Sequence, residues 1–287
     1  MDAAGYWDMR GSRHSSEAVV WVRGTFPGEM TLVTETATAT SGDSATPTIE
    51  DVDVSAEEVV GPTVAAMEAI ESYTLSGNLN QTVQAPNREQ TLQLGITTRV
   101  DRANQALAAE QQLEGAGQSL SSSSYIVDGT LYQRSQQFVQ QYNSEWIKVN
   151  ISAGIDDQFN RNDELAGHRV MLENSSVDLV GAQTIDGERA YRLELDVDEE
   201  ALSAFYGFNG TSITLQSVNT TIWVSTETNR VIRAAGQLRQ QITVQGQQVT
   251  TITNYDERFT YTDVDISLPA AASGAVEVNQ TTGLAGA

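Results

Sequence analysis

The residue types that carry acid–base and metal chemistry are scarce in this chain. It has two histidines, His14 and His168, and no cysteine. The lack of cysteine excludes disulfides, thiol catalysis and cysteine-ligated zinc. Neither histidine has a sequence-adjacent partner that forms a nucleophile-and-base or metal-binding pattern. No nucleophile elbow, phosphate-binding loop or dinucleotide fingerprint occurs. We therefore predict no catalytic residue, no cofactor and a function other than catalysis.

Oxygen ligands gather in one stretch whose chemistry suits calcium. The stretch lacks the regular spacing and the glycine of an EF-hand loop, and close carboxylates are expected by chance among 38 acidic residues. We therefore predict no metal site there. A glycan hydrolase, which would need two buried carboxylates facing each other, stays open as an alternative function. The oxygen-rich residues are Asp156, Asp157, Asn160, Asn162 and Asp163.

Asparagines followed two residues later by Ser or Thr are frequent, accounting for six of the fourteen asparagines. This pattern is the acceptor motif for N-glycosylation and favours a location outside the cytoplasm or on the cell surface. Polar strand and turn positions would explain the same residues equally well. The apolar run at residues 18–22 is too short for the core of a signal peptide, so no signal segment is predicted in the chain as given. The six candidates are Asn80, Asn150, Asn174, Asn209, Asn219 and Asn279.

The charge balance is strongly acidic. The formal net charge is -22, and Lys148 is the single lysine among 16 basic residues. Dense carboxylates with almost no lysine keep a protein hydrated in molar salt, where electrostatic screening is short-ranged. We interpret this composition as adaptation to very high salt. It argues against nucleic acid as a partner, because two polyanions repel each other. The chain has no apolar run of the ~20 residues that a transmembrane helix needs, and proximity to a membrane stays open.

Hydrophobic periodicity predicts mostly antiparallel strands. Leu92, Leu94 and Ile96, for example, alternate with Gln93 and Thr97, which is typical of a sheet with one covered and one wet face. Three helices are expected among the strands, in residues 55–73, about 163–173 and just after 198. Ser55 and Glu58 form a capping-box pattern, although Pro62 favours a start of the regular helix at that residue. The predicted class is α+β, a large curved antiparallel sheet whose concave face is covered by helices.

Composition and hydrophobic periodicity divide the chain into a central domain and two terminal segments. Residues 1–54 are rich in Ser, Thr and acid and offer no apolar face to bury, so they are predicted to be a disordered tether. Residues 55–269 form a single β-rich domain, and residues 270–287 are expected to be a flexible tail.

Three stretches of the predicted domain resemble the LolA/LppX/LprG-type lipoprotein carrier superfamily. They are the helix leading into residues 73–80, the strand–turn–strand pattern of residues 222–233, and the closing segment of residues 259–269. The resemblance implies an unclosed half-barrel, lined by apolar side chains and covered by helices, that holds lipid or lipoprotein acyl chains. Many such proteins are anchored through a lipid-modified cysteine, which this chain does not contain.

These observations favour an extracytoplasmic carrier that holds a hydrophobic small molecule or lipid between sheet and helices. The alternative is a structural or interaction module of the cell surface with a solid core and no ligand. A continuous apolar cavity on the order of several hundred Å3 would distinguish the carrier. The predicted ligand-lining residues are Met67, Ile70, Leu75, Leu79, Leu92, Leu94, Ile96, Ile222 and Val224.

Overall fold

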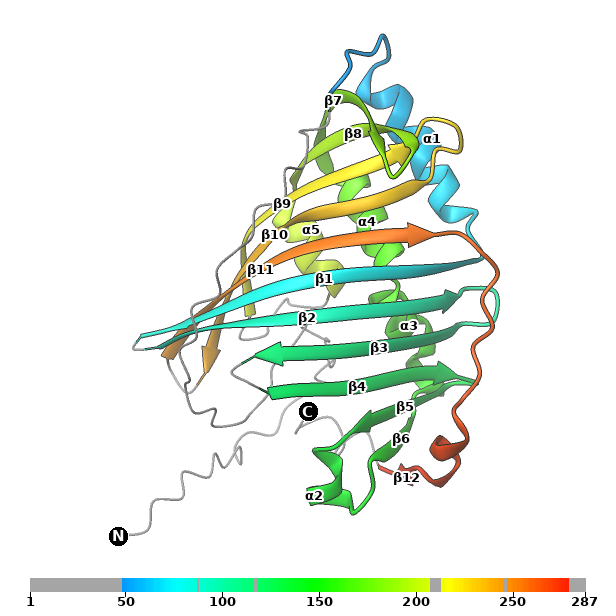
Figure 1. The fold of residues 1–287 in the computed structure, drawn as a ribbon, viewed down its shortest axis with the longest axis vertical. Helices are drawn as coiled ribbons and strands as arrows, with labels where there is room; N and C mark the ends of the chain where they lie inside the picture. The colour runs from blue at the N-terminus through cyan, green and yellow to red at the C-terminus, as the bar shows by residue number, and fades with distance from the viewer. Residues whose placement is uncertain (1–47, 87, 116–117, 207–212, 245–246, 279–287) are drawn as a thin grey trace.

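The computed structural model describes residues 48–86, 88–115, 118–206, 213–244 and 247–278 (Figure 1). Most of the predicted tether, together with Asn209 and Asn279, lies outside these residues. Twelve strands in the described part of the chain form one sheet, in the order β12-β6-β5-β4-β3-β2-β1-β11-β10-β9-β8-β7. All neighbouring pairs are antiparallel except β12 and β6, which are parallel.

Strands that follow one another in the chain are neighbours in the sheet from β1 to β6 and again from β7 to β11, and β1 pairs with β11 to join the two sets. The strands are β1 (Ser72–Ala85), β2 (Arg88–Asp101), β3 (Ala106–Gly115), β4 (Gln118–Val127), β5 (Thr130–Ser135), β6 (Trp146–Asn150), β7 (Ser175–Ile185), β8 (Glu188–Val197), β9 (Ile213–Ser225), β10 (Val231–Val244), β11 (Gln247–Thr260) and β12 (Val276–Glu277). Strand β1 shows the expected alternation, with Tyr73, Leu75 and Leu79 buried between more exposed neighbours. Asp-Gly pairs at residues 128–129 and 186–187 form the turns of two hairpins, and all four turn residues have positive φ, which Asp-Gly hairpins favour.

Helices α1 (Ala56–Glu68), α2 (Phe138–Tyr142), α3 (Ile155–Asn162), α4 (Glu164–Glu173) and α5 (Glu199–Tyr206) complete the fold. The capping box of Ser55 and Glu58 is present. The prediction that regular helix starts at Pro62 was wrong, because α1 already begins at Ala56 and contains Pro62. The residue before a proline normally clashes with the proline ring through its Cβ, and Gly61 has none.

The sheet is strongly curved, and α3, α4 and α5 lie behind it on the concave side (Figure 1). Alternate residues of successive strands face these helices and join one hydrophobic core, which includes Leu165 and Leu172 of α4. The predicted class is therefore confirmed as an α+β half-barrel. No helix in the described residues is both long and apolar enough to span a membrane.

The structure differs from the predicted boundaries at both ends of the domain. Glu50, expected in the tether, exchanges two backbone hydrogen bonds with Ala182 of β7, with N···O distances of 2.7 and 2.9 Å. Residues 270–278, expected in the flexible tail, contain a short 3-10 helix (Ala270–Gly274) and β12. Ile266 and Leu268 pack beside Trp146 against the outer face of the sheet. Ala272 of the segment is buried in the same cluster, and β12 pairs in parallel with β6, so the segment contacts the sheet along its edge.

Candidate functional site: a cavity under the helices

A cavity of about 150 Å3 lies between the concave face of the sheet and helices α3, α4 and α5. Eight successive strands, from β5 to β9 in sheet order, contribute to its wall. The apolar part of the wall consists of Ile96, Leu107, Ala109, Ile126, Leu131, Met171, Leu202, Leu215, Val218 and Leu238. The polar part consists of Gln81, Thr98, Gln111, Ser124, Arg161, Asn162, Glu164, His168, Gln240, Thr253, Tyr255 and Glu257. The space is smaller than the several hundred Å3 expected for a carrier.

One predicted ligand-lining residue, Ile96, lies in the cavity wall. The other eight, Met67, Ile70, Leu75, Leu79, Leu92, Leu94, Ile222 and Val224, are buried in the hydrophobic core. The predicted lining residues are all apolar residues of the covered face, so they do not include the polar residues of the cavity wall. A usable signal was present, since Thr98 falls in the same alternating register as Leu94 and Ile96. Polar residues in that register mark the part of the concave face that lines the cavity.

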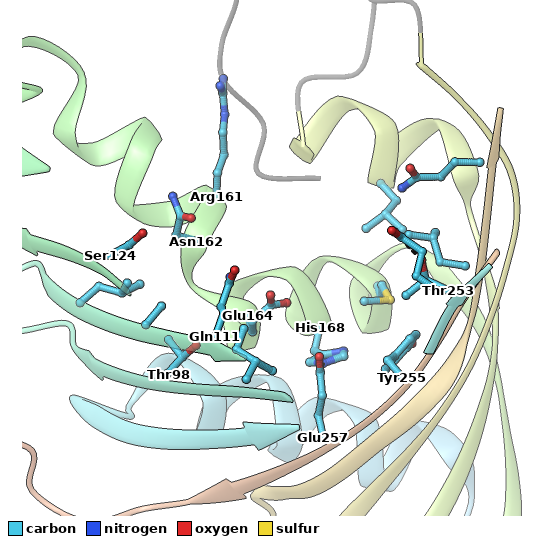
Figure 2. Close-up of a pocket in the computed structure, with 18 of the residues that line it drawn as sticks. Thr98, Gln111, Ser124, Arg161, Asn162, Glu164, His168, Thr253, Tyr255 and Glu257 are labelled. Carbon is cyan, nitrogen blue, oxygen red and sulfur yellow. Dashed lines mark hydrogen bonds and ion pairs between the residues drawn. The ribbon is translucent and has the colours of Figure 1, made fainter. Parts of the chain in front are cut away.

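The cavity wall contains a buried pair of ionisable side chains (Figure 2). His168 of α4 points onto Glu257 of β11, with 3.0 Å between Nε2 and Oε2, and their exposed fractions are 2% and 1%. The partner of His168 thus lies 89 residues away, which explains why no pattern in the sequence revealed it. The imidazole also packs edge-on against Phe259, with ring centroids 5.7 Å apart.

Two glycines on the concave face make room for the polar side chains of β11. Tyr255 extends across β10 to Thr220 of β9, and their hydroxyl oxygens are 2.7 Å apart. It passes over Gly236, where a Cβ atom would lie 2.7 Å from the Tyr255 hydroxyl oxygen and 2.1 Å from the carbonyl oxygen of Asn219. At Gly77, a Cβ atom would lie 3.1 Å from Cγ of Glu257. Small residues are therefore required at both positions for the cavity floor to keep this shape.

Asp163, which was considered as a calcium ligand, has a structural role instead. It accepts hydrogen bonds from Arg102 at 2.6 and 3.0 Å, from the Tyr73 hydroxyl at 2.7 Å and from the backbone of Ala166 at the start of α4. Burial raises the pKa of the Tyr73 phenol well above its usual range, and the charge of Asp163 adds to the shift, so Tyr73 stays a donor. Arg102 also donates to the carbonyl of Met67, which connects the end of α1 to this group.

The other carboxylates of the described residues are not grouped as a metal site or as a pair of facing hydrolase carboxylates. Across the described residues, no group of three or more His, Asp or Glu side chains lies close enough together to hold a metal ion. Within the same residues, the two buried carboxylates are Asp163 and Glu257, and each is paired with a basic side chain. Facing carboxylates of the glycosidase kind are not seen in this part of the chain.

The four glycosylation candidates within the described residues have exposed side chains: Asn80, Asn150, Asn174 and Asn219. Two of them also have local structural roles. Asn150 accepts a hydrogen bond from the backbone of Ser152, and Asn174 donates to the carbonyl of Val170 at the end of α4. Modification of these residues stays a prediction.

The fold and cavity define a class of helix-covered, open β half-barrels. The chain belongs to a family of unknown function (DUF6612), whose model matches residues 55–202. That match begins at the cap of α1 and ends within α5. It therefore includes α3 and α4 completely and the first residues of α5, the three helices that cover the cavity. A search of the curated proteins gives no match.

Several solved structures are similar. LprF from Mycobacterium bovis has 10% identity and a TM-score of 0.47, with 75% of this chain and 96% of that chain covered. The lipoprotein LppX from Mycobacterium tuberculosis has 13% identity and a TM-score of 0.40, with 74% of this chain and 100% of that chain covered. A LolA superfamily protein from Nitrosomonas europaea has 12% identity and a TM-score of 0.30, with 74% of this chain and 96% of that chain covered. These similarities concern the fold alone.

Proposed function

We propose that this protein is an extracytoplasmic binding or carrier protein that holds the apolar chain of a small hydrophobic molecule or lipid in the cavity under α3, α4 and α5. The observation that carries the proposal is the cavity itself. Protein interiors normally have few voids larger than a water molecule, so an apolar space in the centre of a domain calls for an explanation. A solid structural module of the cell surface would have no use for it.

The volume limits what the cavity can hold in this conformation. An apolar cavity of about 150 Å3 accommodates a guest of the size of benzene. A longer chain would have to extend past the residues at the α3 side, where Arg161 points away from the other labelled side chains (Figure 2). The proposed ligand therefore places a short apolar segment inside and leaves the rest of the molecule nearer the surface.

Filling the cavity should abolish binding without unfolding the protein. Ala109 lies in the cavity wall, so Ala109→Leu should occupy ligand space and weaken binding of an apolar probe such as 2-methyl-1-octene at little cost in stability. Ala234 is fully buried in the packed core, so Ala234→Leu should lower the free energy of unfolding by about 1–3 kcal/mol through overpacking. Calorimetric titration and thermal melts of both variants and the parent provide the measurement.

The same binding and melting measurements can contradict the proposal. If the parent binds no apolar probe and Ala109→Leu is as destabilised as Ala234→Leu, the concave face is solid. The surface-module alternative then stands. Native mass spectrometry of the purified parent adds an independent readout, because a carrier should retain a hydrophobic molecule from its host.

A further inference from the structure

The buried pair of His168 and Glu257 is not accounted for by stability. Both side chains lie in the wall of the cavity, and each is more than nine-tenths buried. Desolvation of two ionisable groups is costly, and apolar residues of similar volume often stabilise a protein as well or better. Ionisable groups placed in this way are candidates for ligand recognition.

The pair leaves one hydrogen bond unmade. Nδ1 of His168 is buried and has no hydrogen-bond partner among the described residues. An unsatisfied buried polar atom costs about 1–3 kcal/mol, and native structures contain few of them. His168 forms part of the cavity wall, but Nδ1 itself is covered, so a molecule in the cavity supplies the missing partner by displacing the side chains that cover this atom.

Counting protons shows which kind of partner is missing. The pair is electrically neutral either as a carboxylate with an imidazolium or as a carboxylic acid with a neutral imidazole. In the first form both ring nitrogens carry hydrogen. In the second, an acid that donates to Nε2 leaves the single ring hydrogen on Nδ1. Burying a net charge is far more costly than burying a neutral pair, so these two forms are the ones to compare. Nδ1 carries a hydrogen in the first form, and in the second form when the acid hydrogen is on Oε2 and is donated to Nε2. An acid hydrogen on Oε1 would instead let Nε2 donate and would leave Nδ1 as an acceptor. We infer the arrangement in which Nδ1 is a donor without an acceptor, and the 15N measurement below distinguishes the two.

We propose that His168 recognises a ligand whose apolar chain carries a hydrogen-bond acceptor oxygen, as a ketone or ester carbonyl does, and that Glu257 is the positioning residue that keeps the hydrogen on Nδ1. This proposal rests on the proposed function, because it concerns a ligand of the same cavity. It adds a chemical requirement that a purely apolar cavity would not impose.

The test compares two probes that differ in one atom group. In 2-methyl-1-octene a methylene group replaces the carbonyl oxygen of 2-octanone. The parent should bind 2-octanone more tightly than the double variant His168→Phe with Glu257→Met does, by a factor on the order of 5, as expected for one hydrogen bond. Binding of 2-methyl-1-octene to the same two proteins is the reference, because a change in the shape of the cavity wall acts on both probes and cancels in the ratio of their affinities. This ratio, 2-octanone over 2-methyl-1-octene, should therefore fall in the double variant. The double variant replaces the pair with apolar side chains, so no charge is left buried alone.

A second measurement keeps the test valid if the double variant does not fold. With 15N-labelled histidine, the parent should show a hydrogen on Nδ1 of His168, and addition of 2-octanone should shift this signal. A His14→Gln variant identifies which of the two histidine signals belongs to His168.

The possible results separate the two proposals. An unchanged affinity ratio in the double variant, or no response of the Nδ1 signal to 2-octanone, overturns the role of His168 and leaves the cavity as a binding site. Failure of both probes to bind the parent contradicts the proposed function itself.

Discussion

At the residue scale, Asp163 joins more elements than any other side chain described above. Its carboxylate contacts Arg102 after β2 and Tyr73 at the start of β1, and it caps α4. Arg102 in turn holds the carbonyl of Met67 near the end of α1. Position 163 thus fixes how the helices meet the sheet at this end of the half-barrel.

Removal of this carboxylate should be strongly destabilising. Asp163→Ala leaves the partly buried Arg102 guanidinium without its counter-charge, and the loss of one partner of such a pair costs about 3–5 kcal/mol. Asp157→Ala is the matched control, because Asp157 is exposed on neighbouring α3 and should change stability by less than about 0.5 kcal/mol. Chemical denaturation measures both. Similar stabilities of the two variants would show that the Asp163 cluster is not a structural clamp.

At the element scale, the alternation of residue types predicted long antiparallel strands, and the sequence predicted three of the five described α-helices, α1, α4 and α5. Asp163 and Asp198 cap α4 and α5 as their sequence positions suggest. The order of strands in the sheet and the pairing of His168 with Glu257 were not accessible, because both depend on contacts between residues far apart in the chain. Helix α3 was missed because its acidic residues were read as possible metal ligands.

The floor of the cavity gives a prediction about one strand. Gly236→Ala on β10 would place a methyl group against the carbonyl of Asn219 and the Tyr255 hydroxyl, so it should cost about 1–3 kcal/mol and disturb the cavity. Gly95 on β2 is the control, since its added Cβ would meet its nearest atom at 3.9 Å. Gly95→Ala should be neutral or stabilising by about 0.4–1 kcal/mol. Thermal melts compare the pair, and equal effects would contradict the close approach of Tyr255 to β10.

At the scale of the whole molecule, the net charge of -22 governs how the protein responds to salt. We propose that the fold is adapted to high salt, because repulsion among unscreened carboxylates opposes the compact state. The melting temperature should therefore rise between 0.1 M and 3 M potassium chloride. Sucrose at matched water activity is the control for a general solute effect. A flat or falling melting temperature would contradict adaptation to salt.

An unclosed sheet has two lateral margins where backbone hydrogen-bonding groups can recruit another chain. At one margin, Glu50 is bonded to β7 beside Gly181, where a Cβ atom would lie 2.5 Å from the Glu50 carbonyl oxygen. We expect this short contact to block the pairing of a second chain with β7 at this position. Deletion of residues 1–54 should therefore produce concentration-dependent self-association, whereas deletion of residues 1–47 should leave the protein monomeric. Sedimentation velocity distinguishes the two, and identical behaviour of both truncated chains would show that the margin is protected by other means.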